Sequence, residues 1–234
     1  MRVAARTAGA VLFSLLFACA TAVAQEENGK PNLNAKPPEG AVILFDGKDV
    51  SKWVQRKDPS KPAEWKVEDG AMIAGGGDID TKEQFRDFDL HVEWRTPIPK
   101  EGQKGQGRGN SGVYMLGTYE VQVLESHGLE PLIDGAGSIY NLKAASENRA
   151  LPPMEWQSYD IKFTGPRFDK SGKKTQKARV SVIWNGKKVH DNVEIEGPTR
   201  AKDTEEKPGP APIRLQDHHH PVEFRNIWIV PAKS

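Results

Sequence analysis

Cysteine is almost absent from this sequence of 234 residues, which contains only Cys19. Because a single thiol cannot form an intramolecular disulfide, the fold must be stabilised by packing of its interior rather than by covalent cross-links. The phosphate-binding loop, the GxSxG elbow, the HExxH motif and the dinucleotide fingerprint are absent as well. These absences exclude the most familiar chemistries of nucleotide-binding enzymes, serine hydrolases and zinc peptidases.

A strong net charge is also lacking, because 33 Lys and Arg residues face 32 Asp and Glu residues and the formal charge is +1. Removal of residues 1–24 takes away Arg2 and Arg6 but no acidic residue, which changes the formal charge to −1. Nucleic acids and anionic membranes attract strongly basic surfaces. We therefore expect neither of them as the main partner.

Long apolar runs are lacking too, apart from one near the N-terminus that extends from Ala8 to Ala20. This run is too short to span a bilayer as a helix, so no membrane span is expected. Ala22-Val23-Ala24 fits the small-residue cleavage site of an export signal. We therefore interpret residues 1–24 as a signal peptide and predict an exported protein, periplasmic or secreted. The alternative is a lipoprotein anchored through Cys19.

The rest of the chain reads as a tether followed by one all-β domain. Residues 25–40 are polar and proline-rich, which is typical of a flexible tether. From residue 41 to residue 234, short apolar segments recur between glycines and prolines, and no helical periodicity extends beyond a turn. This spacing predicts a sandwich of β-sheets. The residues expected between its sheets are Val42, Leu90, Val92, Trp94, Tyr114, Val121, Val123, Leu215 and Ile227.

Residues 107–126 are expected to form a loop followed by a β-hairpin. Gly117-Thr118 is typical of a two-residue type II′ turn, because glycine stands first between two β-rich runs. This turn pairs Leu116 with Tyr119 and places Tyr114 on an apolar face that packs on the core. The opposite face would then carry Ser111, Glu120 and Gln122 beside Val113, Met115 and Leu124.

Two groups of polar residues on predicted strands are candidates for a binding site. Glu120 and Gln122 are two residues apart and share a face, where small neighbours would let the hydroxyl groups of a ligand come close. Glu93 and Arg95 lie on the polar face of the alternating segment 87–95. The alternative for each group is a solvated outer face of a sheet, with cross-strand ion pairs in the second case.

Three consecutive histidines, His218, His219 and His220, are the obvious candidates for metal binding. Adjacent residues of an extended chain point in different directions, however, and rarely bind one ion together. A single histidine such as His218, at the end of a sheet, could instead act as an acid, a base or a hydrogen-bond partner.

Several segments stand in a characteristic order from residue 41 to the C-terminus. They are Phe45-Asp46-Gly47-Lys48 with Trp53, Phe88-Asp89-Leu90 with Glu93-Trp94-Arg95, Gly109-Asn110-Ser111-Gly112-Val113, Tyr119-Glu120-Val121-Gln122-Val123, Glu155-Trp156, Pro212-Ile213-Arg214-Leu215-Gln216-Asp217-His218 and Phe224-Arg225-Asn226-Ile227. Taken together, this ordered set resembles the 3-keto-disaccharide hydrolase family, long catalogued as a domain of unknown function in exported bacterial proteins. The resemblance implies a concanavalin A-like jelly-roll sandwich whose concave sheet holds the site, and cleavage of glycosidic bonds in sugars oxidised at C3.

The chemistry of such a substrate assigns roles to the candidate residues. A ketone at C3 acidifies the C2 hydrogen, so a base can remove it, a donor can hold the enolate oxygen, and the group at C1 can leave before water adds. The resemblance makes Glu120 the base and His218 the proton donor or stabiliser. A divalent cation could also hold the enolate oxygen, but the sequence identifies no cofactor. The expected hydroxyl-binding residues are Glu93, Arg95, Asn110, Ser111, Gln122 and Gln216.

The sequence departs from the family pattern at the rim of the expected site. The family usually has glycine after the histidine that corresponds to His218, whereas this chain has His219. Residues 165–177 and 197–209 are longer or more charged than expected. These departures leave the size of the substrate open.

Two other functions are compatible with the same residues. Glu120-Val121-Gln122-Val123-Leu124-Glu125 also resembles the E-x-D-x-x-E strand of jelly-roll endoglucanases, although Gln122 replaces the central aspartate. A retaining mechanism needs both glutamates on one face, and Glu125 would reach the face of Glu120 only through a β-bulge. The third alternative is a lectin-like module in which tryptophans stack on sugar rings and Glu120 only accepts hydrogen bonds. All three predict a carbohydrate ligand, while the sugar, its linkage and the oligomeric state stay open.

Overall fold

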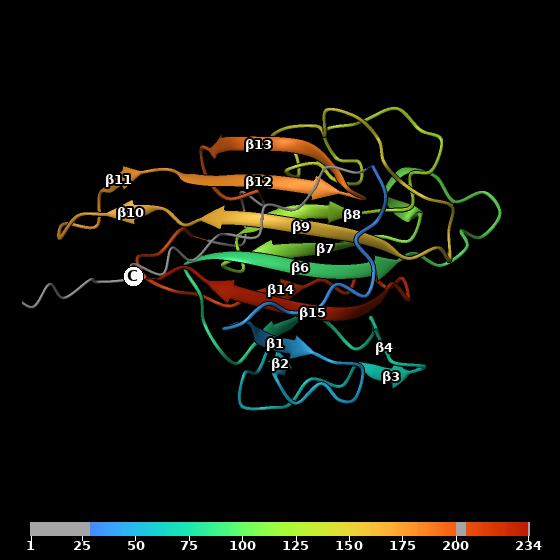
Figure 1. Cartoon of the computed structure of the whole chain (residues 1–234), viewed down its shortest axis with the longest axis horizontal. Helices are drawn as coiled ribbons and strands as arrows, with labels where there is room; N and C mark the ends of the chain where they lie inside the picture. Colours follow the sequence, from blue (N-terminus) through green and yellow to red (C-terminus); the bar gives the residue numbers. More distant parts are fainter. Residues whose placement is uncertain (1–28, 200–204, 234) are drawn as a thin grey trace, which may run out of the picture.

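The computed structural model describes residues 29–199 and 205–233, so the predicted signal peptide lies outside the described residues. Figure 1 shows a molecule whose regular structure is almost entirely β-strands, joined by loops. The helical element in the described ranges is a short 3-10 turn, η1 (Gly105–Gly107), and no helix there is long and apolar enough to cross a membrane. In chain order the strands are β1 (Val42–Phe45), β2 (Trp53–Gln55), β3 (Lys66–Glu68), β4 (Ala71–Ile73), β5 (Ile79–Thr81), β6 (Asp87–Arg95), β7 (Ser111–Met115), β8 (Tyr119–Val123), β9 (Gln157–Thr164), β10 (Arg167–Phe168), β11 (Lys174–Gln176), β12 (Ala178–Trp184), β13 (Lys187–Ile195), β14 (Arg214–Leu215) and β15 (Glu223–Pro231).

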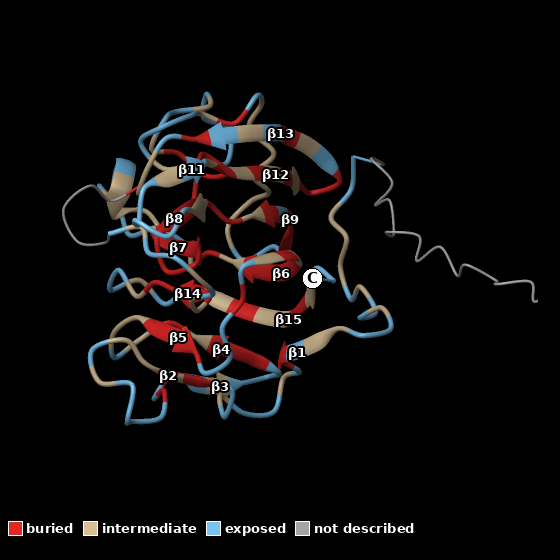
Figure 2. Ribbon diagram, turned by 90° about the vertical axis from the view of Figure 1, so that its left-hand side faces the viewer, coloured by how far each residue is buried: buried red, intermediate tan, exposed pale blue. Residues whose placement is uncertain are grey.

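Two antiparallel sheets form the body of the molecule. The larger sheet has eight strands in the order β13-β12-β9-β6-β15-β4-β3, with β1 also paired to β15. The smaller sheet has five strands in the order β2-β5-β14-β7-β8, and β10 and β11 form a separate ribbon. Figure 2 shows the two sheets as stacked layers with buried residues along their strands. The predicted all-β jelly-roll sandwich of one domain is therefore confirmed.

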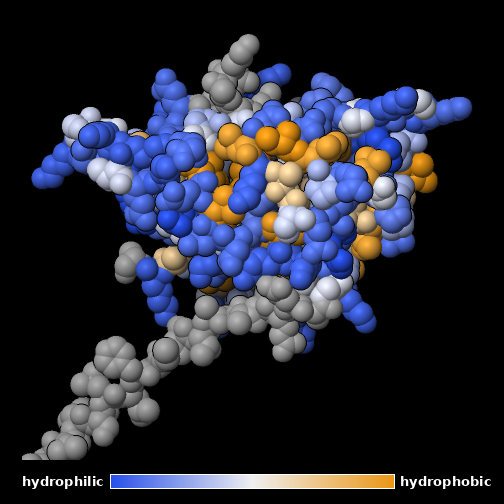
Figure 3. Space-filling view, turned by 90° about the horizontal axis from the view of Figure 1, so that it is seen from above, coloured by the Kyte–Doolittle hydropathy of each residue, from blue (hydrophilic) through white to orange (hydrophobic). Residues whose placement is uncertain are grey.

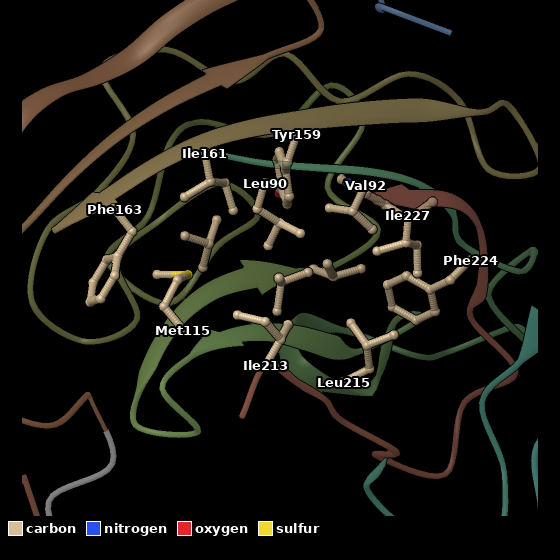
Figure 4. Packing of buried hydrophobic residues seen from close by; sticks show 14 of the residues in the cluster. Leu90, Val92, Met115, Tyr159, Ile161, Phe163, Ile213, Leu215, Phe224 and Ile227 are labelled. Atoms are coloured by element: carbon tan, nitrogen blue, oxygen red, sulfur yellow. The ribbon is translucent and has the colours of Figure 1, made fainter. Parts of the chain in front are cut away.

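The core lies between the two sheets and is built from alternate residues of their strands. Figure 4 shows side chains of the larger sheet, among them Leu90 and Val92, directed towards Met115 and Leu215 of the smaller sheet. Alternation along a strand sends neighbouring side chains to opposite faces, which is why these positions were predictable. Of the residues expected between the sheets, Leu90, Val92, Trp94, Val121, Val123, Leu215 and Ile227 belong to this core, and Val42 packs partly buried against it.

The β7–β8 hairpin differs from its predicted register by one residue. Met115, not Leu116, pairs with Tyr119, so the connection is a three-residue loop in place of the expected two-residue type II′ turn. Leu116 has a left-handed backbone with φ of 52°, which costs an L-residue about 1–2 kcal/mol. Its side chain is buried beside the core, and burying a leucine gains roughly 1.5–3 kcal/mol. Burial of Leu116 therefore explains why the turn prediction was wrong.

The shifted register exchanges the two faces of β7. Tyr114 pairs with Glu120 and Gly112 pairs with Gln122, so these residues share the face that points away from the core. Ser111 pairs with Val123 and lies on the core side. A slip of one residue moves every side chain of a strand to the other face. Tyr114 is thus buried as predicted, but it is not part of the core between the sheets.

The segment before β1 crosses the outer face of the larger sheet. Residues 25–40 were expected to be a flexible tether, and the chain is described from Gly29 onward. The amide of Asn32 donates to Ser158 Oγ at 2.9 Å, and the amide of Asn34 donates to Glu93 Oε1 at 2.5 Å. The carbonyl of Ala35 accepts a hydrogen bond from Asn226 Nδ2 at 3.0 Å. These contacts make this part of the segment a component of the folded domain.

Candidate functional site

The outer face of the smaller sheet gathers polar side chains from several strands, and we call it the polar face. Register explains why they meet: Arg214 of β14 pairs with Tyr114 on one side and with Asp80 of β5 on the other. The amide of Gln216 continues this ladder by donating to the carbonyl of Gly112 at 3.1 Å. The polar face consists of Asp80, Gly112, Tyr114, Glu120, Gln122, Arg214 and Gln216.

The Glu120 carboxylate lies directly over Gly112. A Cβ atom added to Gly112 would be 2.3 Å from Glu120 Oε1 and 2.9 Å from Cε2 of the Tyr114 ring. Only glycine leaves room for this approach of two side chains to the backbone. Glu120 is 2% exposed, and its amide donates to Thr199 Oγ1 at 3.0 Å. The sheet therefore holds a shielded carboxylate at a position fixed by its neighbours.

Gln122 is oriented by a group of amides at one end of the polar face. Its Nε2 donates to Gln106 Oε1 at 3.0 Å and to the carbonyl of Asp134 at 3.3 Å. Gln106, in the η1 turn, also accepts from Asn110 Nδ2 at 2.8 Å and donates to the Asp134 carbonyl at 2.8 Å. Gln122 Oε1 is buried and has no hydrogen-bond partner among the described residues. An orphaned carbonyl oxygen of this kind suits the hydroxyl group of a ligand.

Arg214 supplies a fixed positive charge on the same face. Its Nε and Nη2 donate to the two carboxylate oxygens of Asp80 at 2.7 and 3.2 Å, and its Nη1 donates to the carbonyl of Gly117 at 2.9 Å. Such bidentate pairs fix geometry as well as charge. The guanidinium carbon lies 5.9 Å from the centroid of the Tyr114 ring. Sequence reasoning gave Tyr114 no role because the predicted register turned it towards the core, and it gave Arg214 none because only pairing of distant strands brings it beside Tyr114.

Gln216 and Ser111 are adjacent in the fold but belong to different faces. Gln216 Nε2 donates to the Tyr114 hydroxyl oxygen at 3.1 Å, which places it on the polar face. Ser111 Oγ donates to the carbonyl of Gln216 at 2.6 Å and is fully buried. The expected position of Ser111 beside Glu120 is therefore corrected: its hydroxyl group supports the backbone of the next strand.

His218 lies at the exposed end of the row that begins with Arg214 and Gln216. Its ring stacks on that of His220, with centroids 6.1 Å apart. The carboxylate of Asp217 fixes this turn by accepting from the amides of Gly77 and His219, both at 2.8 Å. Within residues 29–199 and 205–233, no three His, Cys, Asp or Glu side chains are grouped so that they could hold a metal ion.

Glu93 and Arg95 are on the other side of the molecule. Both project from the outer face of β6, whose alternate residues form the core, so the core separates them from Glu120. The Glu93 carboxylate accepts from Arg225 Nε at 2.7 Å and from Asn226 Nδ2 at 2.8 Å. Arg95 pairs with Glu223 at 2.6 Å. The structure does not bring these two residues to the polar face, and their contacts match the cross-strand ion pairs considered as the alternative.

A buried histidine accompanies Glu93 beneath the N-terminal segment. His91 Nδ1 lies 2.5 Å from Asp160 Oδ1, its Nε2 lies 3.5 Å from Glu93 Oε1, and its ring stacks on Trp228. Burial alone would lower the pKa of His91, but the hydrogen bond to Asp160 and the nearby Glu93 carboxylate outweigh it and raise this pKa above its usual value. Burial would likewise raise the pKa of Glu93, but its contact with His91 and its hydrogen bonds from Asn226 and Arg225 hold that pKa below the usual value.

Two hollows of the described surface are lined by residues other than Glu120 and Gln122. One of about 90 Å³ lies between the β7–β8 turn and residues 205–211. Another of about 600 Å³ lies between residues 139–143 and strand β13. Figure 3 looks onto the β13 side of the molecule, where apolar side chains gather within a polar surround. Neither of these two hollows has the Glu120 carboxylate in its lining.

Comparison with known proteins gives a consistent result. Residues 40–230 match the family model of the 3-keto-alpha-glucoside-1,2-lyase-like domain. A 3-keto-disaccharide hydrolase of Bacteroides thetaiotaomicron is 31% identical over 165 residues, which are 64% of this chain and 52% of that protein. This chain thus spans about half the length of that curated relative.

Solved structures resemble the fold as well. A candidate glycosyl hydrolase from Parabacteroides distasonis is 39% identical, with a TM-score of 0.76 and coverage of 83% of this chain and 85% of that chain. A second one from the same organism is 21% identical, with a TM-score of 0.62 and coverage of 83% and 95%. At that identity the second structure supports the fold alone.

Proposed function

The chain belongs to the 3-keto-alpha-glucoside-1,2-lyase-like family, and from this premise we propose that it cleaves the glycosidic bond of 3-keto glycosides. The observation that carries the proposal is the shielded carboxylate of Glu120, held over Gly112 among hydroxyl-binding groups. The name of the Bacteroides relative, a 3-keto-disaccharide hydrolase, supports the same substrate class. The substrate is therefore a carbohydrate that another, oxidising enzyme has converted to the C3 ketone.

The reaction needs a base beside C2 of the sugar. The ketone at C3 makes the C2 hydrogen acidic, and Glu120 removes it as a proton while the electron pair forms an enolate. The C1–O bond then breaks, a C1–C2 double bond forms, and the departing oxygen takes a proton. Water adds to C1 in a later step, which gives net hydrolysis. His218, at the exposed end of the polar face, donates the proton to the departing group.

The remaining polar groups bind the sugar. Gln122 Oε1, which has no partner among the described residues, accepts a hydrogen bond from a sugar hydroxyl group. Gln216 and Asn110 supply further amide groups nearby. Ser111 contributes only by supporting the Gln216 backbone. Glu93 and Arg95 stabilise the fold on the opposite side and take no part in binding.

The endoglucanase-like alternative finds no support in the surroundings of Glu125. Its carboxylate pairs with Arg108 and accepts a hydrogen bond from the amide of His127 at 3.0 Å. A retaining mechanism requires a second carboxylate that is free to attack the sugar. We therefore assign Glu125 a structural role in shaping the loop before β7.

Matched substrates test the proposed function. The full chain is incubated with a 3-keto glucoside and with the parent glucoside that carries a C3 hydroxyl group, and release of the aglycone is followed. We expect turnover of the ketone alone, because the parent lacks an acidified C2 hydrogen. Equal turnover of both compounds would contradict the C2 chemistry, and binding without turnover of either would favour the lectin-like alternative.

A further inference from the structure

Tyr114 stands directly across the hairpin from Glu120. Their cross-strand pairing places both side chains on the polar face, and Tyr114 is 2% exposed. Directly opposed residues in a sheet have Cβ atoms about 4.5–5.5 Å apart. A phenol group is thus built into the sheet next to the carboxylate that acts as the base.

The two side chains converge over a single glycine. The point that a Cβ atom of Gly112 would occupy lies 2.3 Å from Glu120 Oε1 and 2.9 Å from Tyr114 Cε2, the ring carbon next to the one that bears the hydroxyl group. The proton and the ketone oxygen of a 3-keto sugar are on neighbouring atoms, C2 and C3. A base and an oxygen-binding donor that share one small region match this requirement.

The neighbours of Tyr114 prepare its hydroxyl group to donate. Gln216 Nε2 donates to the phenol oxygen at 3.1 Å and holds the hydroxyl group over the polar face. The Arg214 guanidinium, held by Asp80, lies 5.9 Å from the ring centroid and favours negative charge on this side. Both contacts assist a hydroxyl group that shares its proton with a developing anion.

We infer that Tyr114 is a catalytic residue that holds the enolate oxygen at C3 while Glu120 removes the C2 proton. This inference rests on the proposed function. In the step, the C2–H bond breaks and its proton moves to Glu120, and the electron pair forms the C2–C3 enolate, whose oxygen accepts a hydrogen bond from Tyr114. Collapse of the enolate expels the C1 oxygen, which takes a proton from His218, so Tyr114 ends the step with its own proton.

Position separates the roles of Tyr114 and His218. His218 is four residues beyond Arg214, the residue opposite Tyr114. Gln216 lies between them and its Nε2 donates to the Tyr114 hydroxyl oxygen, so His218 is two residues beyond a side chain that contacts Tyr114. Tyr114 is therefore beside the base, whereas His218 is towards the exposed end of the row, where the departing group can leave.

Proton exchange in deuterated water tests the inference separately from bond cleavage. The probe is a 3-keto C-glucoside, in which carbon replaces the glycosidic oxygen, so enolate formation is possible but elimination is not. Wild-type protein should exchange the C2 hydrogen, and Tyr114→Phe should slow exchange about 100-fold, the usual loss for one oxyanion donor. Tyr119→Phe is the matched control, because Tyr119 is on the same hairpin but faces the core. It should exchange at the wild-type rate.

Two further variants complete the test. His218→Asn should retain C2 exchange and lose cleavage of the O-glucoside. Replacement of Tyr114 by 3-fluorotyrosine keeps its shape, provides the test if Tyr114→Phe fails to fold, and should speed exchange because the phenol is more acidic. Wild-type exchange in Tyr114→Phe, or a rate that does not respond to fluorination, would overturn the inference. Absence of both exchange and cleavage in wild-type protein would instead overturn the proposed function.

Discussion

Substitution of Gly112 by alanine should displace the Glu120 carboxylate without removing any functional group. The new Cβ would be 2.3 Å from Glu120 Oε1, whereas ordinary contact begins at 3.4 Å, so the carboxylate has to withdraw by about 1.1 Å. The ring of Tyr114, 2.9 Å from the same point, blocks part of the free space. A displacement of about 1 Å in a catalytic group typically costs 10²-fold in rate, or about 2.7 kcal/mol.

The assay compares kcat and KM of wild-type protein and Gly112→Ala on a 3-keto glucoside. We expect kcat to fall about 100-fold, while the fold survives with a loss of about 1–3 kcal/mol from overpacking. Gly75→Ala is the control, because a Cβ at Gly75 meets nothing within 4 Å. The double variant Gly112→Ala with Glu120→Asp should recover part of the lost rate, since the shorter side chain withdraws from the new methyl group. Unchanged kcat in Gly112→Ala would refute the assigned position of the base.

Three further predictions concern residues around the site, the opposite face and the N-terminus. Gln106→Ala should raise KM about 10-fold and lower kcat by a smaller factor, because it releases Gln122 from a hydrogen bond of 3.0 Å. A fold-change in kcat as large as that in KM would contradict a positioning role. The raised pKa of His91 contributes stability that is complete below its unfolded pKa of about 6.5 and is lost as pH rises through the folded pKa. The free energy of unfolding in urea should therefore be higher for wild type than for His91→Gln, and this difference should shrink from pH 6 to pH 9. A difference that does not change with pH would contradict the linkage. Export predicts a mature N-terminus at Gln25, which sequencing of the processed protein checks; an acylated Cys19 would favour the lipoprotein alternative.

The sequence was sufficient to predict the fold because alternation is a local property. Leu90, Val92 and Trp94 were expected in the core and lie there, since period-two patterning alone decides which face of a strand is buried. The same pattern placed Glu93 and Arg95 on the other face, but it could not say which surface that face belonged to. Pairing of distant strands decides this, and no local signal in the sequence encodes it.

The hairpin shows where local reasoning failed. Glycine followed by threonine favours a two-residue turn, but burial of Leu116 against the core favours a longer one. The stabilising free energy comes from tertiary packing of the Leu116 side chain, which turn statistics do not include. The resulting shift of one residue brought Tyr114 and Gly112 to the face of Glu120 and took Ser111 away from it.

Other residues that contribute to the site or to the fold could not be recognised from the sequence. Gln106 is in a glycine-rich loop, and its role appears only when Gln122 and Asn110 reach it in the folded chain. Residues 32–35 are polar like a linker, yet their backbone hydrogen bonds to Glu93 and Ser158 bridge more than 50 positions of sequence. The amino-acid composition of a segment indicates whether it is exposed to solvent, but it cannot identify a hydrogen-bond partner from a distant part of the chain.

The central claim, that Glu120 removes the C2 proton of a 3-keto glycoside, is tested most directly by Glu120→Gln in deuterated water. The amide keeps the shape and hydrogen bonding of the carboxylate but cannot take a proton. Wild-type protein should release sugar labelled at C2, whereas Glu120→Gln should still bind substrate while kcat falls about 100-fold or more. Full activity with wild-type labelling in Glu120→Gln would contradict the account.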